Sequence, residues 1–158
     1  MSARSGIGYD SHRLVADRPL ILAGVELEET ERGLEGHSDA DVATHAVIDA
    51  LLGAAGLDDI GHHFPDDRAE YRDADSFDLL RQVRALLEQR GWTISWVDLT
   101  VICERPKLSP HREQMRERLA EGLGGGRVNV KFTTNEGMGA IGRGEGIAAI
   151  AVATVEDA

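Results

Sequence analysis

The first residues in the chain that could do chemistry are Asp10 and His12, in the stretch GYDSH. Residues two apart on an extended strand project from the same face, so the carboxylate and the imidazole would lie side by side. Such a pair is either half of a metal site or an ordinary polar strand end. Alone, the pair favours the strand end, because a metal site needs further ligands from elsewhere in the chain.

A second set of polar side chains recurs at helical spacing in the stretch DADVATHAVIDALLGAAG. Asp41, His45 and Asp49 form one stripe on a helix whose other face is apolar. Together, Asp10, His12 and His45 make a set of two histidines and one carboxylate, which with an open fourth position is typical of catalytic zinc. Asp49 is either a surface acid or the acceptor for the second ring N–H of His45.

The stretch HSD at 37–39 directly precedes this helix. Ser38 is the expected N-cap, with Asp41 at the N3 position of a capping box. Because helix N-termini attract anions, His37 is a candidate to hold a phosphate oxygen. Taken alone, a plain cap beside a surface histidine is the commoner meaning of these residues.

The last third of the chain contains KFTTNEGMGAIGRGEGIA. Hydroxyls, backbone amides and an arginine are groups that bind phosphate, and a glutamate among them suggests Mg²⁺ held partly by phosphate oxygens. The spacing of a Walker loop is absent, and glycine-rich turns are often no more than turns. The candidates in this stretch are Lys131, Thr133, Thr134, Glu136, Arg143 and Glu145.

Two further stretches leave alternatives open. ICERPKLSPH at 102–111 leaves a strand through Pro106 and Pro110, and it either contacts a base edge or is an ordinary connector. In DIGHHFPD, the adjacent His62 and His63 point in different directions, so at least one is expected at the surface.

Composition narrows the class of protein. The chain has 158 residues and a net charge of −11, which argues against nucleic acid as a partner. Its single cysteine, Cys103, excludes an internal disulfide and fits a reducing compartment. No apolar stretch is long enough for a signal peptide core or a membrane span, so we expect a soluble cytoplasmic protein.

The pattern of elements predicts one α+β domain over residues 1–158. Strands are expected at 4–10, 20–27 with a break at Gly24, 93–104, 127–134 and 146–155; helices are expected at 39–56, 75–91 and 109–123. Residues 57–73 are expected to form a long loop. The elements interleave without strict alternation, which favours one mixed sheet with helices packed on one side. The apolar stretch 146–155 predicts a central strand or a surface between subunits, buried on both faces.

The blocks GYDSH, HSDADVATH, RPKLSPH and GRGEGIA, in this order, resemble the 2-C-methyl-D-erythritol 2,4-cyclodiphosphate synthases of the non-mevalonate isoprenoid pathway. The resemblance covers nearly the whole chain. It implies a phosphorus–oxygen lyase that converts 4-diphosphocytidyl-2-C-methyl-D-erythritol 2-phosphate to the cyclic diphosphate and CMP. It also implies a homotrimer with active sites between subunits, one Zn²⁺ per site, and Mg²⁺ or Mn²⁺ as a second metal.

The same resemblance implies roles for individual residues. Asp10, His12 and His45 match the zinc ligands, Glu136 the ligand of the second metal, and His37 and Thr134 the groups that assist the transition state. The residues that match those binding the erythritol phosphate end of the substrate are Asp59, Ile60, Gly61, Phe64, Pro65, Asp66, Asp67 and Arg68. The cytidine-side wall, from a neighbouring subunit, matches Cys103, Glu104, Arg105, Pro106, Lys107, Leu108, Ser109 and Thr133. Further substrate contacts match Ser11, Ser38, Asn135, Ala140 and Arg143. A cavity on the trimer axis matches Tyr9, Arg143 and Glu145.

One position departs from the family pattern, since Ala140 stands where a bulkier aromatic residue is frequent. Only backbone contacts to the substrate are expected there. Two other classes of function compete with the synthase: a zinc hydrolase of phosphate esters, and a non-catalytic protein that binds isoprenoid phosphates. The first would release free phosphate or a linear product, and the second would release no CMP.

Overall fold

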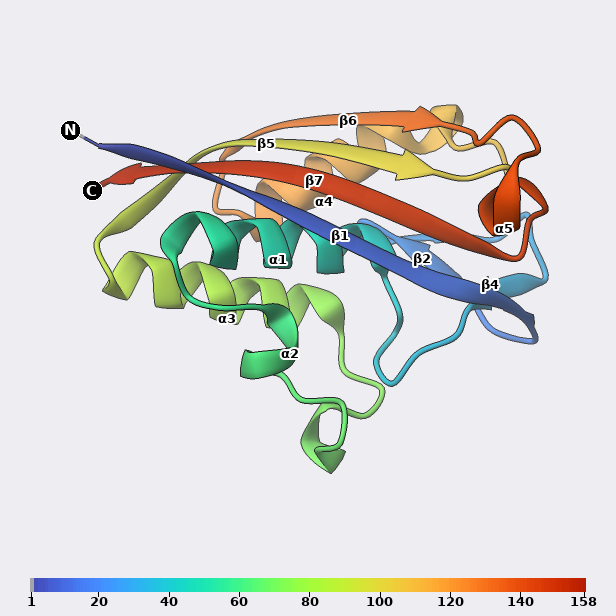
Figure 1. Cartoon of the computed structure of the whole chain (residues 1–158), viewed down its shortest axis with the longest axis horizontal. Helices are drawn as coiled ribbons and strands as arrows, with labels where there is room; N and C mark the ends of the chain where they lie inside the picture. Colours follow the sequence, from blue (N-terminus) through green and yellow to red (C-terminus); the bar gives the residue numbers. More distant parts are fainter. Residues whose placement is uncertain (1) are drawn as a thin grey trace.

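A five-stranded mixed sheet carries the Asp10–His12 pair on its second strand (Figure 1). The structure is a computed structural model and describes residues 2–158. The strand order is β4-β1-β7-β5-β6; only β5 and β6 are parallel. The strands are β1 (Ala3–Ala16), β4 (Arg32–Leu34), β5 (Trp92–Ile102), β6 (Arg127–Thr133) and β7 (Gly146–Asp157). The predicted α+β class and the central place of the C-terminal strand are confirmed.

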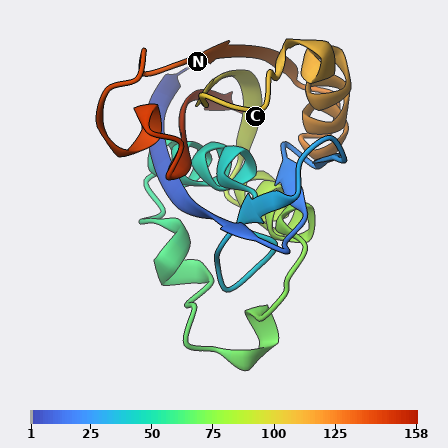
Figure 2. The ribbon, with the colours of Figure 1, turned by 90° about the vertical axis from the view of Figure 1, so that its right-hand side faces the viewer.

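The longer helices cover one face of this sheet. They are α1 (Val42–Ala55), α3 (Ser76–Gln89) and α4 (Arg112–Gly122). Figure 2 shows α1 in the hollow of the curved sheet, with the segment that follows it projecting below. Within the described residues, no helix is both long enough and apolar enough to span a bilayer.

Two glycines let β1 approach α1 closely. A Cβ atom at Gly6 would lie 2.3 Å from the carbonyl oxygen of Ala50, and one at Gly8 would lie 2.0 Å from that of Ala46. No side chain fits at either distance, so the strand can rest on the helix only where it carries glycine. The alternation also places Asp10 on the face that meets α1, where its carboxylate reaches His45.

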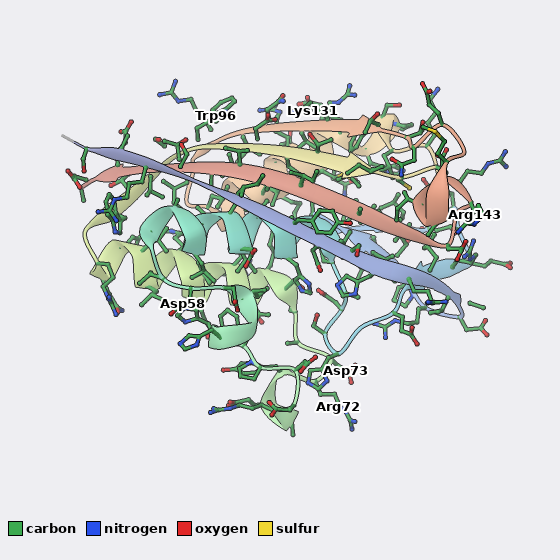
Figure 3. All side chains as sticks on the ribbon, viewed as in Figure 1. Asp58, Arg72, Asp73, Trp96, Lys131 and Arg143 are labelled. Carbon is green, nitrogen blue, oxygen red and sulfur yellow. The ribbon has the colours of Figure 1, made fainter. Side chains whose placement is uncertain are left out.

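The opposite face of the sheet bears exposed apolar side chains. Ile7 is 69% exposed and Tyr9 61%, while Ile150 and Val152 on β7 are 38% and 39% exposed. Figure 3 shows Trp96 and Lys131 on this same side, away from α1 and α3. The prediction that β7 is buried on both faces is therefore wrong for the single chain, because its second half alternates between buried and exposed positions.

Several predicted boundaries are also wrong. The predicted break of the strand 20–27 at Gly24 is confirmed, but the two halves form a hairpin of β2 (Leu20–Leu22) and β3 (Val25–Leu27), because positive φ angles at Ala23 and Gly24 turn the chain. The predicted loop after α1 contains α2 (Ile60–His63) and a 3₁₀ turn (Ala69–Tyr71). A 3₁₀ turn (Ser109–His111) precedes α4, and α5 (Gly139–Gly142) follows β6.

The N-cap of α1 is Asp41 rather than Ser38. The Asp41 side chain accepts a hydrogen bond from the Thr44 N–H at 3.0 Å. It accepts three more, from the Ala23 and Gly24 N–H groups of the β2–β3 turn and from the Thr44 hydroxyl. The same carboxylate thus starts the helix and joins it to the hairpin.

Candidate functional site

The side chains of Asp10, His12 and His45 meet between β1 and α1. Asp10 Oδ2 lies 2.9 Å from His12 Nε2 and 3.1 Å from His45 Nδ1. One ligand atom from each residue falls within 4.8 Å of the others, and all three residues are partly buried. The structure therefore brings together the residues that the sequence singled out as a candidate metal site.

A backbone carbonyl orients His12 for this role. His12 Nδ1 lies 2.8 Å from the carbonyl oxygen of Glu35, which can only accept a hydrogen bond. Nδ1 therefore carries a proton, and Nε2 is the atom that faces Asp10. Metal-binding histidines are commonly held in this way by a carbonyl on the second ring nitrogen.

The electrostatics of the cluster favour a carboxylate. Burial would raise the pKa of Asp10, but hydrogen bonds from His12 and His45, together with their charges, lower it to about 2. Burial would lower the pKa of His12, but its hydrogen bond to Asp10 and the charge of that carboxylate raise it. An ionised carboxylate with two imidazoles fits a divalent cation, and this donor set is typical of catalytic zinc.

The second ring nitrogen of His45 does not meet Asp49. His45 Nε2 lies 2.8 Å from Ser76 Oγ and 3.2 Å from Ser38 Oγ. Asp49 instead accepts a hydrogen bond from the Ile60 N–H at 3.1 Å and so holds the start of α2. Asp49 as the partner of His45 is therefore wrong, and Ser76 is a contact that the sequence pattern did not reveal.

Arg18 is another residue that the sequence pattern missed. Its guanidinium donates to the carbonyl oxygens of Gly36 and Ser38, at 3.2 and 3.1 Å. These two carbonyls flank His37, whose Nε2 lies 3.0 Å from the carbonyl oxygen of Arg68. The segment that precedes α1 is thus held on both sides, although no local signal in the sequence joins Arg18 to it.

A pocket of about 470 Å³ opens beside the three candidate ligands. It is lined by Asp10, His12, His37, Ser38, His45, Ile60, Gly61, Phe64, Pro65, Asp66, Asp67, Tyr71 and Leu79. Most residues predicted for the erythritol phosphate end are among them. Asp59 and Arg68 are not: Asp59 caps α2 through the His62 N–H, and Arg68 pairs with Glu70.

The residues predicted for the cytidine side line a separate pocket of about 550 Å³. Its walls are Cys103, Glu104, Arg105, Pro106, Lys107, Leu108, Ser109, Arg112, Phe132, Thr133 and Thr134. The two pockets share no residue. Since the strand order is β1-β7-β5-β6, the two strands that lead into the second pocket, β5 and β6, lie two and three inter-strand spacings from β1, or about 10 and 14 Å.

Around the second pocket, the chain reversal after β6 is held by Glu104. Its Oε1 accepts hydrogen bonds from the N–H groups of Asn135 and Gly137, at 2.9 and 3.2 Å. Thr134, Glu136 and Ala140 are exposed. Thr134 lines the second pocket, neither Thr134 nor Glu136 lines the metal-side pocket, and Glu136 is outside the group formed by Asp10, His12 and His45.

The residues predicted for a trimer axis are Tyr9, Arg143 and Glu145. Tyr9 follows Gly8 on β1 and projects from the exposed face of the sheet, opposite to Asp10. Arg143, labelled in Figure 3 near α5, has Nε 2.6 Å from Glu145 Oε2. Ser11 is exposed on the same side of β1 as Tyr9.

Comparison with known proteins gives a consistent result. The model of the YgbB family matches residues 3–156. The chain is 54% identical over 158 residues to a 2-C-methyl-D-erythritol 2,4-cyclodiphosphate synthase of Thermosynechococcus vestitus, covering 99% of this chain and 98% of the relative. It is 57% identical over 152 residues to the synthase of that name from Symbiobacterium thermophilum, covering 95% and 96%.

Solved structures agree with the sequence matches. The bifunctional IspDF of Campylobacter jejuni superposes with a TM-score of 0.94 at 38% identity, over 99% of this chain and 43% of that one. A CDP complex of IspF from Plasmodium falciparum superposes with a TM-score of 0.85 at 30% identity, over 99% and 97%.

Proposed function

The chain belongs to the YgbB family, whose curated relatives are named cyclodiphosphate synthases, and from this premise we propose its reaction. It converts 4-diphosphocytidyl-2-C-methyl-D-erythritol 2-phosphate to 2-C-methyl-D-erythritol 2,4-cyclodiphosphate and CMP. The observation that carries the proposal is the cluster of Asp10, His12 and His45 opening into a pocket. A binding protein has no need of three metal-ligand side chains at the mouth of its site.

The reaction is an intramolecular phosphoryl transfer. An oxygen of the 2-phosphate forms a bond to the β-phosphorus, and the bond from that phosphorus to the bridging oxygen breaks, so CMP leaves with the electron pair. The substrate supplies its own nucleophile, and the chain therefore needs no covalent catalyst. Such transfers depend on positioning and charge neutralisation more than on a strong base.

The chain supplies these two effects with side chains of different kinds. Zn²⁺ held by Asp10, His12 and His45 would polarise the β-phosphate as a Lewis acid. His37 donates a hydrogen bond to an oxygen that gains charge, and Thr134 does the same from the cytidine side. Glu136 would hold a second metal, Mg²⁺ or Mn²⁺, which would neutralise charge on the diphosphate.

We further propose that the working enzyme is a homotrimer. The exposed apolar side chains Ile7, Tyr9, Trp96, Ile150 and Val152 support this, because a contiguous apolar face of this kind is typical of an interface. The separation of the two pockets within one chain supports it as well. In the trimer, the Cys103–Ser109 wall of one subunit completes the metal-side pocket of its neighbour, while Tyr9, Arg143 and Glu145 lie around the axis. The enzyme acts in the cytoplasm.

Phosphorus NMR of the products tests the reaction. We expect the resonances of the cyclic diphosphate together with CMP, and no free phosphate. Free phosphate or a linear product would identify a hydrolase instead. His45→Ala should lose zinc and turnover while remaining folded, whereas His62→Ala, at a histidine side chain that is 65% exposed, should keep both. A His45→Ala variant with full zinc occupancy and normal turnover would remove the basis of the proposal.

A further inference from the structure

Ser76 is a buried hydroxyl group at the start of α3, with no exposed surface. It belongs to a small group of buried polar side chains that surrounds the N-terminal ends of α1 and α3. The members of this group are Ser38, Asp41, Thr44 and Ser76. Burying a hydroxyl is unfavourable unless its hydrogen bonds are satisfied, so the partners of Ser76 indicate what it does.

One partner of Ser76 is Asp39. The Ser76 hydroxyl donates a short hydrogen bond to Asp39 Oδ1, and the Ser76 N–H donates to Asp39 Oδ2 at 3.0 Å. The Asp41 N–H also donates to Asp39 Oδ1, at 3.1 Å. A carboxylate only accepts hydrogen bonds, so the single hydroxyl proton of Ser76 is directed to Asp39.

The second partner of Ser76 is His45, whose Nε2 lies 2.8 Å from Ser76 Oγ. Since the hydroxyl proton is already committed, Oγ must accept at this contact and Nε2 must carry the proton. In the neutral ring, Nδ1 is then the nitrogen whose lone pair a cation can take, and it lies 3.1 Å from Asp10 Oδ2. A hydrogen bond from Nδ1 to Asp10, together with the one from Nε2 to Ser76, belongs to the doubly protonated ring. Ser38 Oγ is a weaker second acceptor, at 3.2 Å, and it also accepts from the Ala40 N–H.

The position of Ser76 is itself fixed by the backbone. The Asp73 N–H donates to the carbonyl oxygen of His37 at 2.8 Å, and the Asp39 N–H donates to that of Ala74 at 3.1 Å. Asp73 lies in the loop that leads into α3 (Figure 3). The segment that enters α3 and the segment that enters α1 are therefore joined directly beside His45.

We propose that Ser76, oriented by Asp39, is a positioning residue that selects Nδ1 of His45 as the atom available to a divalent cation. The inference rests on the proposed function, because it takes His45 as a metal ligand. In this role Ser76 accepts a hydrogen bond from the ring nitrogen that does not bind the metal. Such an acceptor fixes both the tautomer and the plane of a metal-bound imidazole. Because Ser76 is the first residue of α3, its hydrogen bond to His45 also makes the affinity for the metal depend on α3, although that helix supplies no candidate ligand.

The tautomer of His45 in the metal-free protein gives the first test. Proton–nitrogen correlation spectra distinguish protonated Nε2 from protonated Nδ1, at a pH about two units above the ordinary histidine pKa. The Asp10 carboxylate favours a proton on Nδ1, whereas the Ser76 oxygen favours one on Nε2. The ratio of the two tautomers therefore reports the strength of the Ser76 contact. We expect mainly the Nε2–H form in the wild-type chain and a shift toward Nδ1–H in Ser76→Ala. Mainly Nδ1–H in the wild-type chain, or no shift in the variant, would overturn the inference.

Zinc affinity, measured by competition with a chromophoric chelator, gives the second test. We expect Ser76→Ala to bind Zn²⁺ about tenfold to a hundredfold more weakly, as for other residues behind metal ligands. Ser76→Thr keeps the hydroxyl and should recover most of the affinity. Ser95→Ala is the matched control, because Ser95 donates only to the Thr154 carbonyl oxygen on the sheet. Equal affinity in Ser76→Ala and the wild-type chain contradicts the proposal, as does an equal loss in Ser95→Ala.

These measurements separate the inference from the proposed reaction. If the wild-type protein binds zinc and shows the Nε2–H tautomer but makes no cyclic diphosphate, the proposed function fails and the role of Ser76 stands. If the wild-type protein makes the cyclic diphosphate but Ser76→Ala changes neither the tautomer of His45 nor the zinc affinity, the proposed function stands and the role of Ser76 fails. Urea unfolding of each variant shows whether a change in zinc affinity merely follows a loss of stability. A loss of stability alone would not shift the tautomer of His45.

Discussion

Replacing Asp41 by asparagine should destabilise the protein by far more than the loss of one surface hydrogen bond. Asp41 is 1% exposed and accepts four hydrogen bonds. The N–H groups of Ala23 and Thr44 donate to Oδ1 at 2.8 and 3.0 Å, and the Gly24 N–H and the Thr44 hydroxyl donate to Oδ2 at 2.8 and 2.7 Å. An asparagine keeps one acceptor oxygen and puts an NH₂ group in the place of the other.

The magnitude follows from these donors. In the better orientation the Ala23 and Thr44 N–H groups keep an oxygen, and the Thr44 hydroxyl can rotate to accept from the new NH₂ group. The Gly24 N–H is left facing a donor, which costs about 1–3 kcal/mol. The surviving hydrogen bonds are no longer made to a charged acceptor and weaken by about 1 kcal/mol each. The lower cost of burying a neutral amide instead of a carboxylate offsets part of this loss. We expect a net loss of about 2–4 kcal/mol, a large share of a typical stability of about 5–15 kcal/mol.

Urea unfolding of the metal-free protein measures this loss. Chelator must be present and the protein concentration equal in all samples, because metal binding and association both add to apparent stability. Asp75→Asn is the matched control, since Asp75 is the exposed N-cap of α3 and accepts from the Phe77 N–H. Asparagine caps helices as well as aspartate does, so this control should change stability by less than about 0.5 kcal/mol. If Asp41→Asn lies within the same limit, the role given to its four hydrogen bonds is refuted.

Four further outcomes can be measured. Gly8→Ala should force β1 away from the Ala46 carbonyl and lower the free energy of unfolding by about 3 kcal/mol or more. Gly53→Ala is the control: its Cβ would meet nothing closer than 3.8 Å, so it should leave the stability unchanged or raise it by about 0.5–1 kcal/mol. Equal urea midpoints for the two variants would contradict this. Zinc at about a hundred times its Kd should stabilise the wild-type protein by about 2.7 kcal/mol and should leave His45→Ala unchanged in thermal unfolding; equal shifts in the two proteins would rule out the site. Burial raises the pKa of the Cys103 thiol to about 11, so alkylation should be slow in the folded protein at neutral pH and fast in urea. Because the unfolded thiol titrates near 9.0, this group's contribution to stability should be present below pH 9.0 and should decline as the pH rises toward 11; a stability that does not change over this window would contradict the assignment.

The sequence by itself was enough to gather the candidate ligands. Alternation along β1 placed Asp10 and His12 on one face, and helical spacing placed His45 on a defined stripe of α1. Both inferences rest on periodicity, which is a local property of the chain. The close approach of α1 to Gly6 and Gly8, on the same face of β1 as Asp10, became visible only in the structure.

Only the tertiary structure decided the contacts between segments that are distant in the sequence. The cap of α1 is Asp41 rather than Ser38, and the Asp41 carboxylate accepts both from the Thr44 N–H of the helix and from two N–H groups of the β2–β3 turn. The second ring nitrogen of His45 meets Ser76, 31 residues away, rather than Asp49 at the next helical turn. No local pattern encodes such contacts, because they depend on how α3 packs against α1 and on where the hairpin returns to the helix.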